Sequence, residues 1–351
     1  MQRSATAGGK VGQGGAAKGA ATGAASVARV RAAVDALVPG RYLLAVSGGR
    51  DSMVLLDAFT TLRTDAVGVA TFDHGTGPAA TAAADHVVRA TLQRELAVML
   101  GHGAGGTQES TWRRQRWEFL RGWAAELRAT IVTAHTEDDQ VETVFMRALR
   151  DAGARGLAAM YAPSPIARPL LGVSRVDAAA YAAERGVEWV EDPSNARVAH
   201  LRNRVRLEML PAIERVRPGF ARELLDIARR AADWRSSLAA LVDAMGVTAL
   251  DGAGVRSVDG SGARAAESGE LTVIIPAQAL ETITAEALPL VWQELVGRAG
   301  GSLDWRGTER LAAESPKVRS GAEIPLSGGI VVTRTSTTFV VRNRGGDAPL
   351  Y

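Results

Sequence analysis

Short apolar runs alternate with longer amphipathic stretches through the N-terminal half of the chain. The runs have the length of buried strands, and the amphipathic stretches repeat their apolar positions at helical spacing. A first helix near Val30 to Val38 ends at Pro39-Gly40. The pattern then predicts strands at 42–46, 66–72, 96–100 and 130–134, and helices at 53–62, 79–92, 108–127 and from about 138. Strands separated by helices favour βαβ units, so we expect an α/β fold with a parallel doubly wound sheet.

The pattern changes towards the C-terminus and predicts a smaller helical and β domain there. We expect a helix at 176–185, a short strand near 187–190, helices at 216–245 and 290–296, a Gly/Ser-rich loop at 251–269, a hairpin of 324–326 with 330–334, and a strand at 339–342. The predicted division is a disordered basic tail at 1–27, an α/β domain at 28–212 and a C-terminal domain at 213–351.

Composition narrows the class of protein. Hydrophobic residues make up 46% of the chain and charged residues 23%, as in ordinary globular proteins. No apolar run is long enough to span a membrane, and residues 1–27 lack the apolar core of a secretory signal, so we expect a cytoplasmic protein. The 351 residues include no cysteine, which excludes disulfides, thiolate metal sites and cysteine nucleophiles within them.

The formal net charge is only +3, but the positions of the basic residues are informative. Nearly all of the 41 Lys and Arg residues are arginine, and they cluster at 112–117, 202–206 and 215–217. Trp112 and Trp117 are interleaved with the first cluster. Arginines beside aromatic rings suit phosphate backbones and unstacked bases, so the pattern predicts an RNA partner. A solvated helix face explains the clusters equally well.

The segment Ser47-Gly48-Gly49-Arg50-Asp51-Ser52 lies between the first predicted strand and a predicted helix. Such a junction points backbone N–H groups and the positive end of a helix at one place, which suits a phosphate chain. The segment lacks the Gly-Lys-Ser/Thr ending of a Walker A loop. Asp51 is the candidate Mg²⁺ ligand, because hard cations take carboxylate and phosphate oxygens together. A Gly-Gly turn without function is the alternative.

A second candidate site follows the fourth predicted strand. His135 directly follows that strand, and Asp139 and Glu142 share one face of the next helix because they are three residues apart. Ligands bind at the carboxyl ends of parallel strands, which favours a site here. Acidic residues that only stabilise a helix start, and a histidine that is only packed, are the alternatives. The GxGxxG match at 101–106 is interpreted as a loop, because no helix begins at its last glycine.

Seven motifs, taken in order, resemble the tRNA(Ile)-lysidine synthetase family of PP-loop ATP pyrophosphatases. They are SGGRDS at 47–52, DHG at 73–75, TWRRQRW at 111–117, TAHTEDDQVET at 133–143, IARPLL at 166–171, EDPSN at 191–195 and RNRVR at 202–206. The resemblance implies a PP-loop, Rossmann-like catalytic domain followed by a tRNA-docking domain, and we expect one such appendage. The chain departs from the family's HxxHGLR pattern at 71–77, and Thr136 replaces the second histidine of AHH.

The resemblance also implies an activity: a ligase that joins free lysine to C2 of the wobble cytidine of CAU-anticodon isoleucine tRNA. ATP would adenylate the cytidine and leave as AMP and pyrophosphate, with Mg²⁺ bound by Asp51. Asp139 and Glu142 would bind the amino groups of lysine, and Arg113 and Arg206 would contact phosphate or the cytosine oxygen. The implied nucleotide-binding residues are Ser47, Gly48, Gly49, Arg50, Asp51, Ser52 and His135.

Two other interpretations remain open at this point. The first is another PP-loop enzyme that adenylates a small molecule or thiolates tRNA. Thiolating members and glutamine-using members rely on cysteine, which argues against them here. The second is a nucleotide-binding module without catalysis, which would not need the acidic segment at 137–142. The pattern does not set the oligomeric state.

Overall fold

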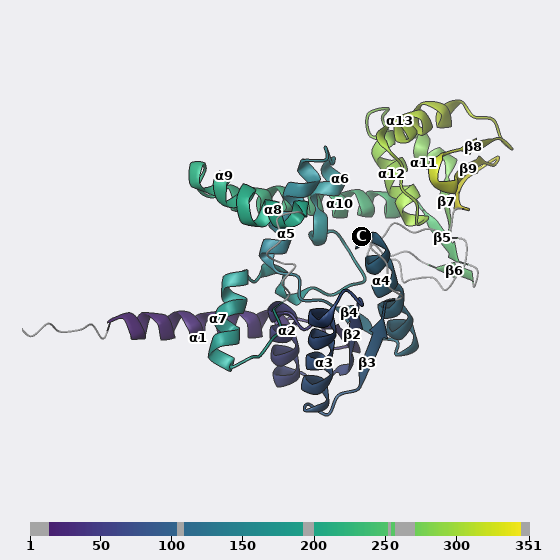
Figure 1. The fold of residues 1–351 in the computed structure, drawn as a ribbon. Helices are drawn as coiled ribbons and strands as arrows, with labels where there is room; N and C mark the ends of the chain where they lie inside the picture. Colours follow the sequence, from purple (N-terminus) through teal and green to yellow (C-terminus); the bar gives the residue numbers. More distant parts are fainter. Residues whose placement is uncertain (1–13, 104–108, 192–199, 252–253, 257–270, 345–351) are drawn as a thin grey trace, which may run out of the picture. The chain divides into compact units, whose positions relative to one another are not determined.

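The computed structural model describes residues 14–103, 109–191, 200–251, 254–256 and 271–344 (Figure 1). These residues form two units. The first contains the described residues up to Gln140 together with Ile166–Leu207, and the second contains Val141–Pro165 together with the residues from Glu208 onward. The sequence pattern did not indicate that Val141–Pro165 belongs with the C-terminal part of the chain.

The first unit is built on a four-stranded parallel sheet with the order β3-β2-β1-β4. Its strands are β1 (Tyr42–Ala45), β2 (Ala66–Asp73), β3 (Val98–His102) and β4 (Thr130–Val132). The helices between and after them are α2 (Arg50–Leu62), α3 (Pro78–Leu92), α4 (Glu109–Glu126), the first turn of α5 (Glu137–Ala148), η2 (Pro169–Gly172), α7 (Arg175–Arg185) and α8 (Leu201–Arg204), and α5 continues into the second unit at Val141. The strand order reverses at β1, because β2 pairs on one side of it and β4 on the other.

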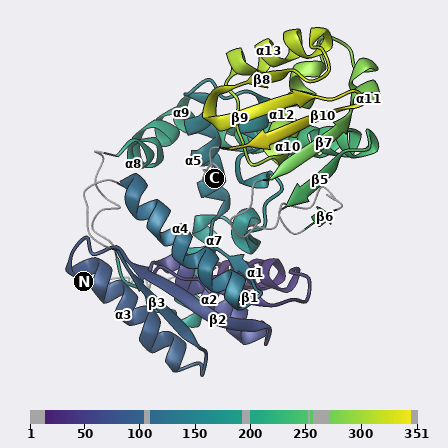
Figure 2. The ribbon, with the colours of Figure 1, turned by 90° about the vertical axis from the view of Figure 1, so that its right-hand side faces the viewer.

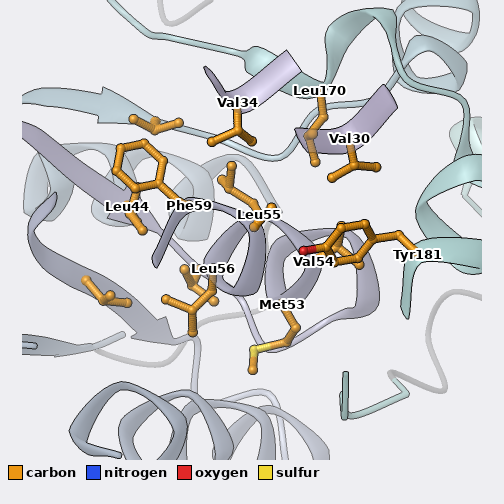
Figure 3. Close-up of a cluster of buried hydrophobic side chains, with 14 of the residues drawn as sticks. Val30, Val34, Leu44, Met53, Val54, Leu55, Leu56, Phe59, Leu170 and Tyr181 are labelled. Atoms are coloured by element: carbon orange, nitrogen blue, oxygen red, sulfur yellow. The ribbon is translucent and has the colours of Figure 1, made fainter. Parts of the chain in front are cut away.

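Helices cover both faces of this sheet, as the predicted doubly wound fold requires. On one face, Leu44 of β1 packs in a buried cluster with α2, where Leu55 and Phe59 are fully buried (Figure 3). On the other face, Leu43 packs in a separate cluster with Trp117 of α4. Adjacent residues of one strand therefore face opposite layers, as strand geometry dictates.

Helix α1 (Gly14–Asp35) precedes the sheet and packs against α7. The Ser26 hydroxyl donates to Asp177 Oδ1 over 2.7 Å, and the Arg29 guanidinium pairs with the same oxygen. Asp177 also accepts from the hydroxyl of Ser174, the N-cap residue of α7. The tail expected at 1–27 is thus helical from Gly14 onward, and residues 1–13 lie outside the described part of the chain.

Other local predictions differ from the structure in identifiable ways. The segment 187–190 has no regular secondary structure and pairs with none of the described strands, although Val190 N–H donates to the Gly48 carbonyl oxygen over 3.0 Å. The helix expected at 216–245 is observed as α10 (Phe220–Ala244), and Arg217 to Gly219 separate it from the preceding helix α9 (Leu210–Val216). Most of the EDPSN motif and most of the Gly/Ser-rich loop lie outside the described residues, although 254–256 of that loop form a strand. The GxGxxG segment is described only at 101–103, where Gly101 and His102 end β3.

The second unit contains a six-stranded sheet with the order β6-β5-β7-β10-β9-β8, and all its pairs are antiparallel. Figure 2 shows β5, β7, β10 and β9 side by side. The strands are β5 (Thr248–Asp251), β6 (Gly254–Arg256), β7 (Thr272–Pro276), β8 (Glu323–Pro325), β9 (Ile330–Arg334) and β10 (Thr338–Asn343), and the main helices beside them are α11 (Ala277–Glu281), α12 (Leu288–Arg298) and α13 (Trp305–Glu314). The predicted hairpin is confirmed, with Ile324 opposite Val332.

Side chains that lie much later in the sequence hold the segment Val141–Pro165 in the second unit. In this segment Arg155, on the short helix α6 (Ala154–Leu157), donates to Glu294 of α12 over 2.8 Å. The ring of Phe145 packs edge-on against Phe220, with the ring centroids 6.1 Å apart.

Across the described residues, no helix has the length and apolar character needed to cross a membrane.

Candidate active site

The loop between β1 and α2 has the geometry of a phosphate-binding loop. Ser47 N–H donates to Ser52 Oγ over 3.1 Å, and Ser52 Oγ donates to the Gly49 carbonyl oxygen over 2.8 Å. These bonds close the loop across the start of α2. Gly49 is the N-cap residue and offers no side chain to cap the helix. The first N–H groups of α2 therefore lie at a positive helix end with no side-chain cap, which is the arrangement that binds anions.

Gly48 is required by the shape of this loop. Its φ of +85° is unfavourable for residues with a side chain, and a Cβ there would lie 2.7 Å from the Ala83 carbonyl oxygen of α3. Gly49 differs, because a Cβ on it would have Ser47 Oγ as its nearest neighbour at 3.7 Å. The first glycine thus lets the loop pack against α3, and the second leaves space on the loop's open side.

Asp51 lies in the first turn of α2, and its carboxylate is flanked by two arginines. Arg50 Nε is 3.1 Å from Asp51 Oδ1, and Arg175 Nε is 3.8 Å from Asp51 Oδ2. Burial raises the pKa of Asp51, the two arginines oppose that rise, and the charge of Asp139 adds to it. The carboxylates of Asp51 and Asp139 both contact the Arg175 guanidinium group, so they lie near the same protein cation.

Asp139 lies in the first turn of α5, where it accepts hydrogen bonds from Thr136 and from two arginines. Thr136 N–H and Thr136 Oγ1 donate to Asp139 Oδ2 over 2.9 and 3.0 Å. The guanidinium groups of Arg175 and Arg202 donate to Asp139 Oδ1 over 3.2 and 2.9 Å. Burial works against ionisation, but Arg202, the Thr136 N–H and Arg175 together hold the pKa of Asp139 below its ordinary value. Asp139 is thus a carboxylate already paired with protein cations.

Arg175 and Arg202 are the site residues that the sequence interpretation missed. Arg175 is the first residue of α7, and its own N–H donates to Asp138 Oδ2 over 2.7 Å. Arg202 lies in α8, within the arginine cluster from which the sequence analysis selected Arg206. The Ser174 N-cap, which accepts from Asp177 N–H three residues on, is a signal that could have placed the start of α7 at Arg175.

The remaining predicted site residues lie in different surroundings. Glu142 is one turn beyond Asp139 on α5 and is 2% exposed. Arg113 of α4 has an exposed side chain beside Arg116. Arg206 lies in a π-helical stretch, Val205–Met209, and within the described chain no ion pair joins it to Asp51. The structure therefore brings Asp51 and Asp139 together and does not bring Arg206 to Asp51.

His135 lies between β4 and α5 and accepts or donates a 2.8 Å hydrogen bond at Nδ1 with the Thr133 hydroxyl. Burial lowers the pKa of His135 to about 4; Asp139 opposes this shift, and Arg168, Arg202 and Arg116 add to it. The imidazole is therefore neutral at pH 7. A neutral ring among three guanidinium groups can act as a hydrogen-bonding group towards an anionic ligand, but it carries no charge itself.

The DHG motif has a structural role in the described chain. Asp73 is 6% exposed and accepts from Gly75 N–H and from the Thr81 hydroxyl, both over 2.8 Å, which fixes the turn from β2 into α3. The ring of His74 packs between Phe72 and Trp112, with centroid distances of 5.1 and 6.4 Å. The turn thereby ties the end of β2 to α4.

The two halves of the candidate site meet where the strand order reverses. The phosphate loop follows β1, and the acidic turn of α5 follows β4, the neighbour of β1 in the sheet. In open parallel sheets, ligands bind outside the carboxyl ends of the strands at such a point. The position at this edge, the N–H groups at the start of α2 and the carboxylates of Asp51 and Asp139 make this the candidate site of the first unit for a phosphate-containing ligand.

Comparison with known protein families identifies the fold of this site. The family model described as a PP-loop domain matches residues 24–213, which is more than half of the chain. Among solved structures, the U34-tRNA thiolase NcsA from Methanococcus maripaludis is similar, with a TM-score of 0.50 and 16% sequence identity, over 61% of this chain and 80% of that chain. This second likeness concerns the fold alone.

Curated relatives are more similar in sequence. A tRNA(Ile)-lysidine synthase from Geobacter sulfurreducens is 37% identical over 222 residues, which is 58% of this chain and 47% of the relative. A tRNA(Ile)-lysidine synthase from Parasynechococcus marenigrum is 34% identical over 218 residues, which is 57% of this chain and 65% of the relative. The matched segment thus spans less than two thirds of the length of either relative.

Proposed function

We propose, from the premise that the chain belongs to the PP-loop domain family, that it is an ATP-dependent ligase that forms lysidine in tRNA. The substrates would be ATP, free lysine and an isoleucine tRNA with a CAU anticodon. The observation that carries the proposal is that the loop after β1 and the carboxylates of Asp51 and Asp139 lie at the same edge of the sheet. The names of the curated relatives support the choice of substrate.

The first chemical step would activate the cytosine ring. The C2 carbonyl oxygen attacks the α-phosphorus of ATP, a phosphorus–oxygen bond forms, and pyrophosphate leaves. The N–H groups of the loop from Gly48 to Asp51 would hold the leaving phosphates, because they are fixed before the charge develops. Ser52 keeps the loop closed in this step, since its hydroxyl joins the Ser47 N–H and the Gly49 carbonyl.

A divalent cation fits the donor groups present. Mg²⁺ in phosphate sites takes one or two carboxylates and completes its shell with phosphate oxygens and water. Asp51 supplies such a carboxylate at the start of α2; burial, and to a smaller extent the charge of Asp139, raise its pKa. When bound, Mg²⁺ would neutralise the negative charge of the phosphates during transfer.

The second step would join lysine to the activated ring. The side-chain amine of lysine attacks C2, a carbon–nitrogen bond forms, AMP leaves with the oxygen, and the amine loses a proton. Asp139 and Glu142 are the proposed partners of the amino groups, because they share one face of α5. Asp139 is paired with Arg175 and Arg202 in the structure, so lysine would have to replace a protein cation there.

The decisive experiment combines the protein with ATP, Mg²⁺, labelled lysine and either of two transcripts, isoleucine tRNA or methionine tRNA with the same CAU anticodon. We expect label in the isoleucine tRNA, with AMP and pyrophosphate released in equal amounts. Asp51→Asn should lose AMP formation. Asp139→Asn should retain nucleotide binding and lose lysine transfer. Label in neither tRNA would disprove the proposed function.

A second candidate remains another PP-loop enzyme that adenylates a small molecule at the same loop. The same assay separates the two functions, because RNA-independent release of pyrophosphate with a small molecule would favour the second one. Ionic strength adds a further criterion. Binding of tRNA by the arginine clusters should weaken steeply with salt, because each neutralised phosphate releases counterions.

A further inference from the structure

Arg175 joins the two carboxylates that the proposed function assigns to different substrates. Its Nε is 3.8 Å from Asp51 Oδ2, and its Nη2 is 3.2 Å from Asp139 Oδ1. The side chain is 14% exposed. One guanidinium group thus neutralises both the carboxylate beside the phosphate loop and the carboxylate at the start of α5.

The position of Arg175 is fixed by its helix on several sides. Its own N–H donates to Asp138 Oδ2, and Glu137 N–H donates to the Val173 carbonyl oxygen over 2.9 Å, so the starts of α5 and α7 are joined directly. Further along α7, Tyr181 donates to Asp57 of α2 over 2.9 Å. The backbone of α7 is therefore anchored to both α5 and α2, while the guanidinium group lies between their carboxylates.

We propose that Arg175 makes lysine binding dependent on prior nucleotide binding. Before nucleotide binds, the guanidinium group occupies Asp139, together with Arg202, and competes with any amine for that carboxylate. Phosphate oxygens in the loop beside Asp51 would give Arg175 a new partner of the kind that a planar guanidinium binds best. The guanidinium group would then leave Asp139, and lysine would compete with Arg202 alone of these two arginines for that carboxylate. This inference rests on the proposed function and adds an order of binding to it.

The required movement is small and local. The guanidinium group already contacts Asp51, which lies in the first turn of α2, the helix whose first N–H groups would face the phosphates. A shift of the side chain towards the loop changes one ion pair and leaves the Arg175 N–H bonded to Asp138. Arg175 is therefore a positioning residue, which acts on lysine through Asp139.

The test is calorimetric titration of lysine into the full chain, with and without a non-hydrolysable ATP analogue and Mg²⁺. We expect the wild-type protein to bind lysine about tenfold more tightly with the nucleotide, within the usual range of coupling between sites. In Arg175→Gln, the lysine affinity measured without nucleotide should rise to near the value that the wild-type protein has with nucleotide. The ratio of the lysine affinities with and without nucleotide should then fall to about one. Arg175→Lys keeps a cation and should retain most of the ratio.

Arg202→Gln is the matched control. Arg202 contacts Asp139 from α8, and the ion partners of Asp51 in the described chain are Arg50 and Arg175. Loss of the Arg202 charge should therefore change lysine affinity in both conditions and leave the ratio as in wild type. Melting temperatures of all three variants show whether α7 is intact, because a purely structural role would lower them without selectively abolishing the ratio.

The outcomes separate this inference from the proposed function. If the wild-type protein forms lysidine but Arg175→Gln keeps the wild-type ratio, the ordering role is wrong and the function stands. If the wild-type ratio is itself one, the ordering role is also wrong. If the wild-type protein neither binds lysine nor transfers it to tRNA, the proposed function and the inference are both wrong.

Discussion

Replacement of each loop glycine by alanine should affect different properties of the protein. In Gly48→Ala, an L-residue must adopt a φ of +85°, which costs about 1–2 kcal/mol. The new Cβ would also lie 2.7 Å from the Ala83 carbonyl oxygen and 2.9 Å from Ala83 Cβ. These are atoms of α3 that cannot rotate away, so overpacking adds about 1–3 kcal/mol. The free energy of unfolding should therefore fall by about 2–5 kcal/mol.

Gly49→Ala is the matched control, one residue along the same loop. Its φ of −76° and ψ of 161° are open to any residue, and the nearest atom to the new Cβ is Ser47 Oγ at 3.7 Å. Stability should change by about 1 kcal/mol or less, because Gly and Ala differ modestly at an N-cap. The methyl group would stand on the loop's open side, so nucleotide affinity should fall about tenfold, or ~1.4 kcal/mol.

Thermal denaturation and calorimetric titration with an ATP analogue measure the two effects separately. The loss predicted for Gly48→Ala corresponds to a melting temperature lower by roughly 4–20 °C for a unit of this size. A wild-type melting temperature for Gly48→Ala would refute the packing argument. A Gly49→Ala protein that is as destabilised as Gly48→Ala, or that binds nucleotide normally, would refute the assignment of the open side to phosphate.

Three further predictions follow from contacts in the structure. Tyr181→Phe removes the buried hydrogen bond to Asp57 and should cost about 1–2 kcal/mol of stability in denaturant titrations without weakening nucleotide binding. His135 has a folded pKa of about 4, so stability should fall as pH drops from about 6.5, the unfolded value, towards 4, and melting curves of His135→Asn should show a smaller fall. Asp304→Ala removes the N-cap bond to Gly307 N–H and should lower stability by about 1 kcal/mol, whereas Asp304→Ser should not.

The architecture of the first unit was predictable because each strand carries its own signal. In β1, Leu43 and Leu44 face opposite layers and are both fully buried, which is why the strand reads as a continuous apolar run rather than an alternating one. The parallel sheet and the position of the phosphate loop both follow from that run and from the glycines after it. The prediction of a strand at 187–190 was wrong, because a short apolar segment carries too little information to specify a pairing partner.

The acidic and glycine-rich parts of the site were predictable, but the arginines around them were not. Arg175 reaches Asp139 across 36 residues, and no local pattern specifies a contact between the starts of two helices. In the cluster at 202–206, the π-helical stretch from Val205 changes the rotation per residue. Helical spacing therefore cannot tell which arginine faces the acids, and Arg202 rather than Arg206 reaches Asp139.

The interleaving of the two units has a consequence for synthesis on the ribosome. The first unit needs Ile166–Leu207 before its sheet is covered, so it cannot be completed when residue 140 emerges. The segment Val141–Pro165 is then already made, but Glu294, the partner of Arg155, follows 139 residues later. At about 5–20 residues per second, the nascent segment waits roughly 7–30 s for that partner. Phe220, the ring partner of Phe145, follows 75 residues after it, so Phe145 is exposed for the first part of this interval. Chaperones that bind nascent apolar segments should recognise the chain there.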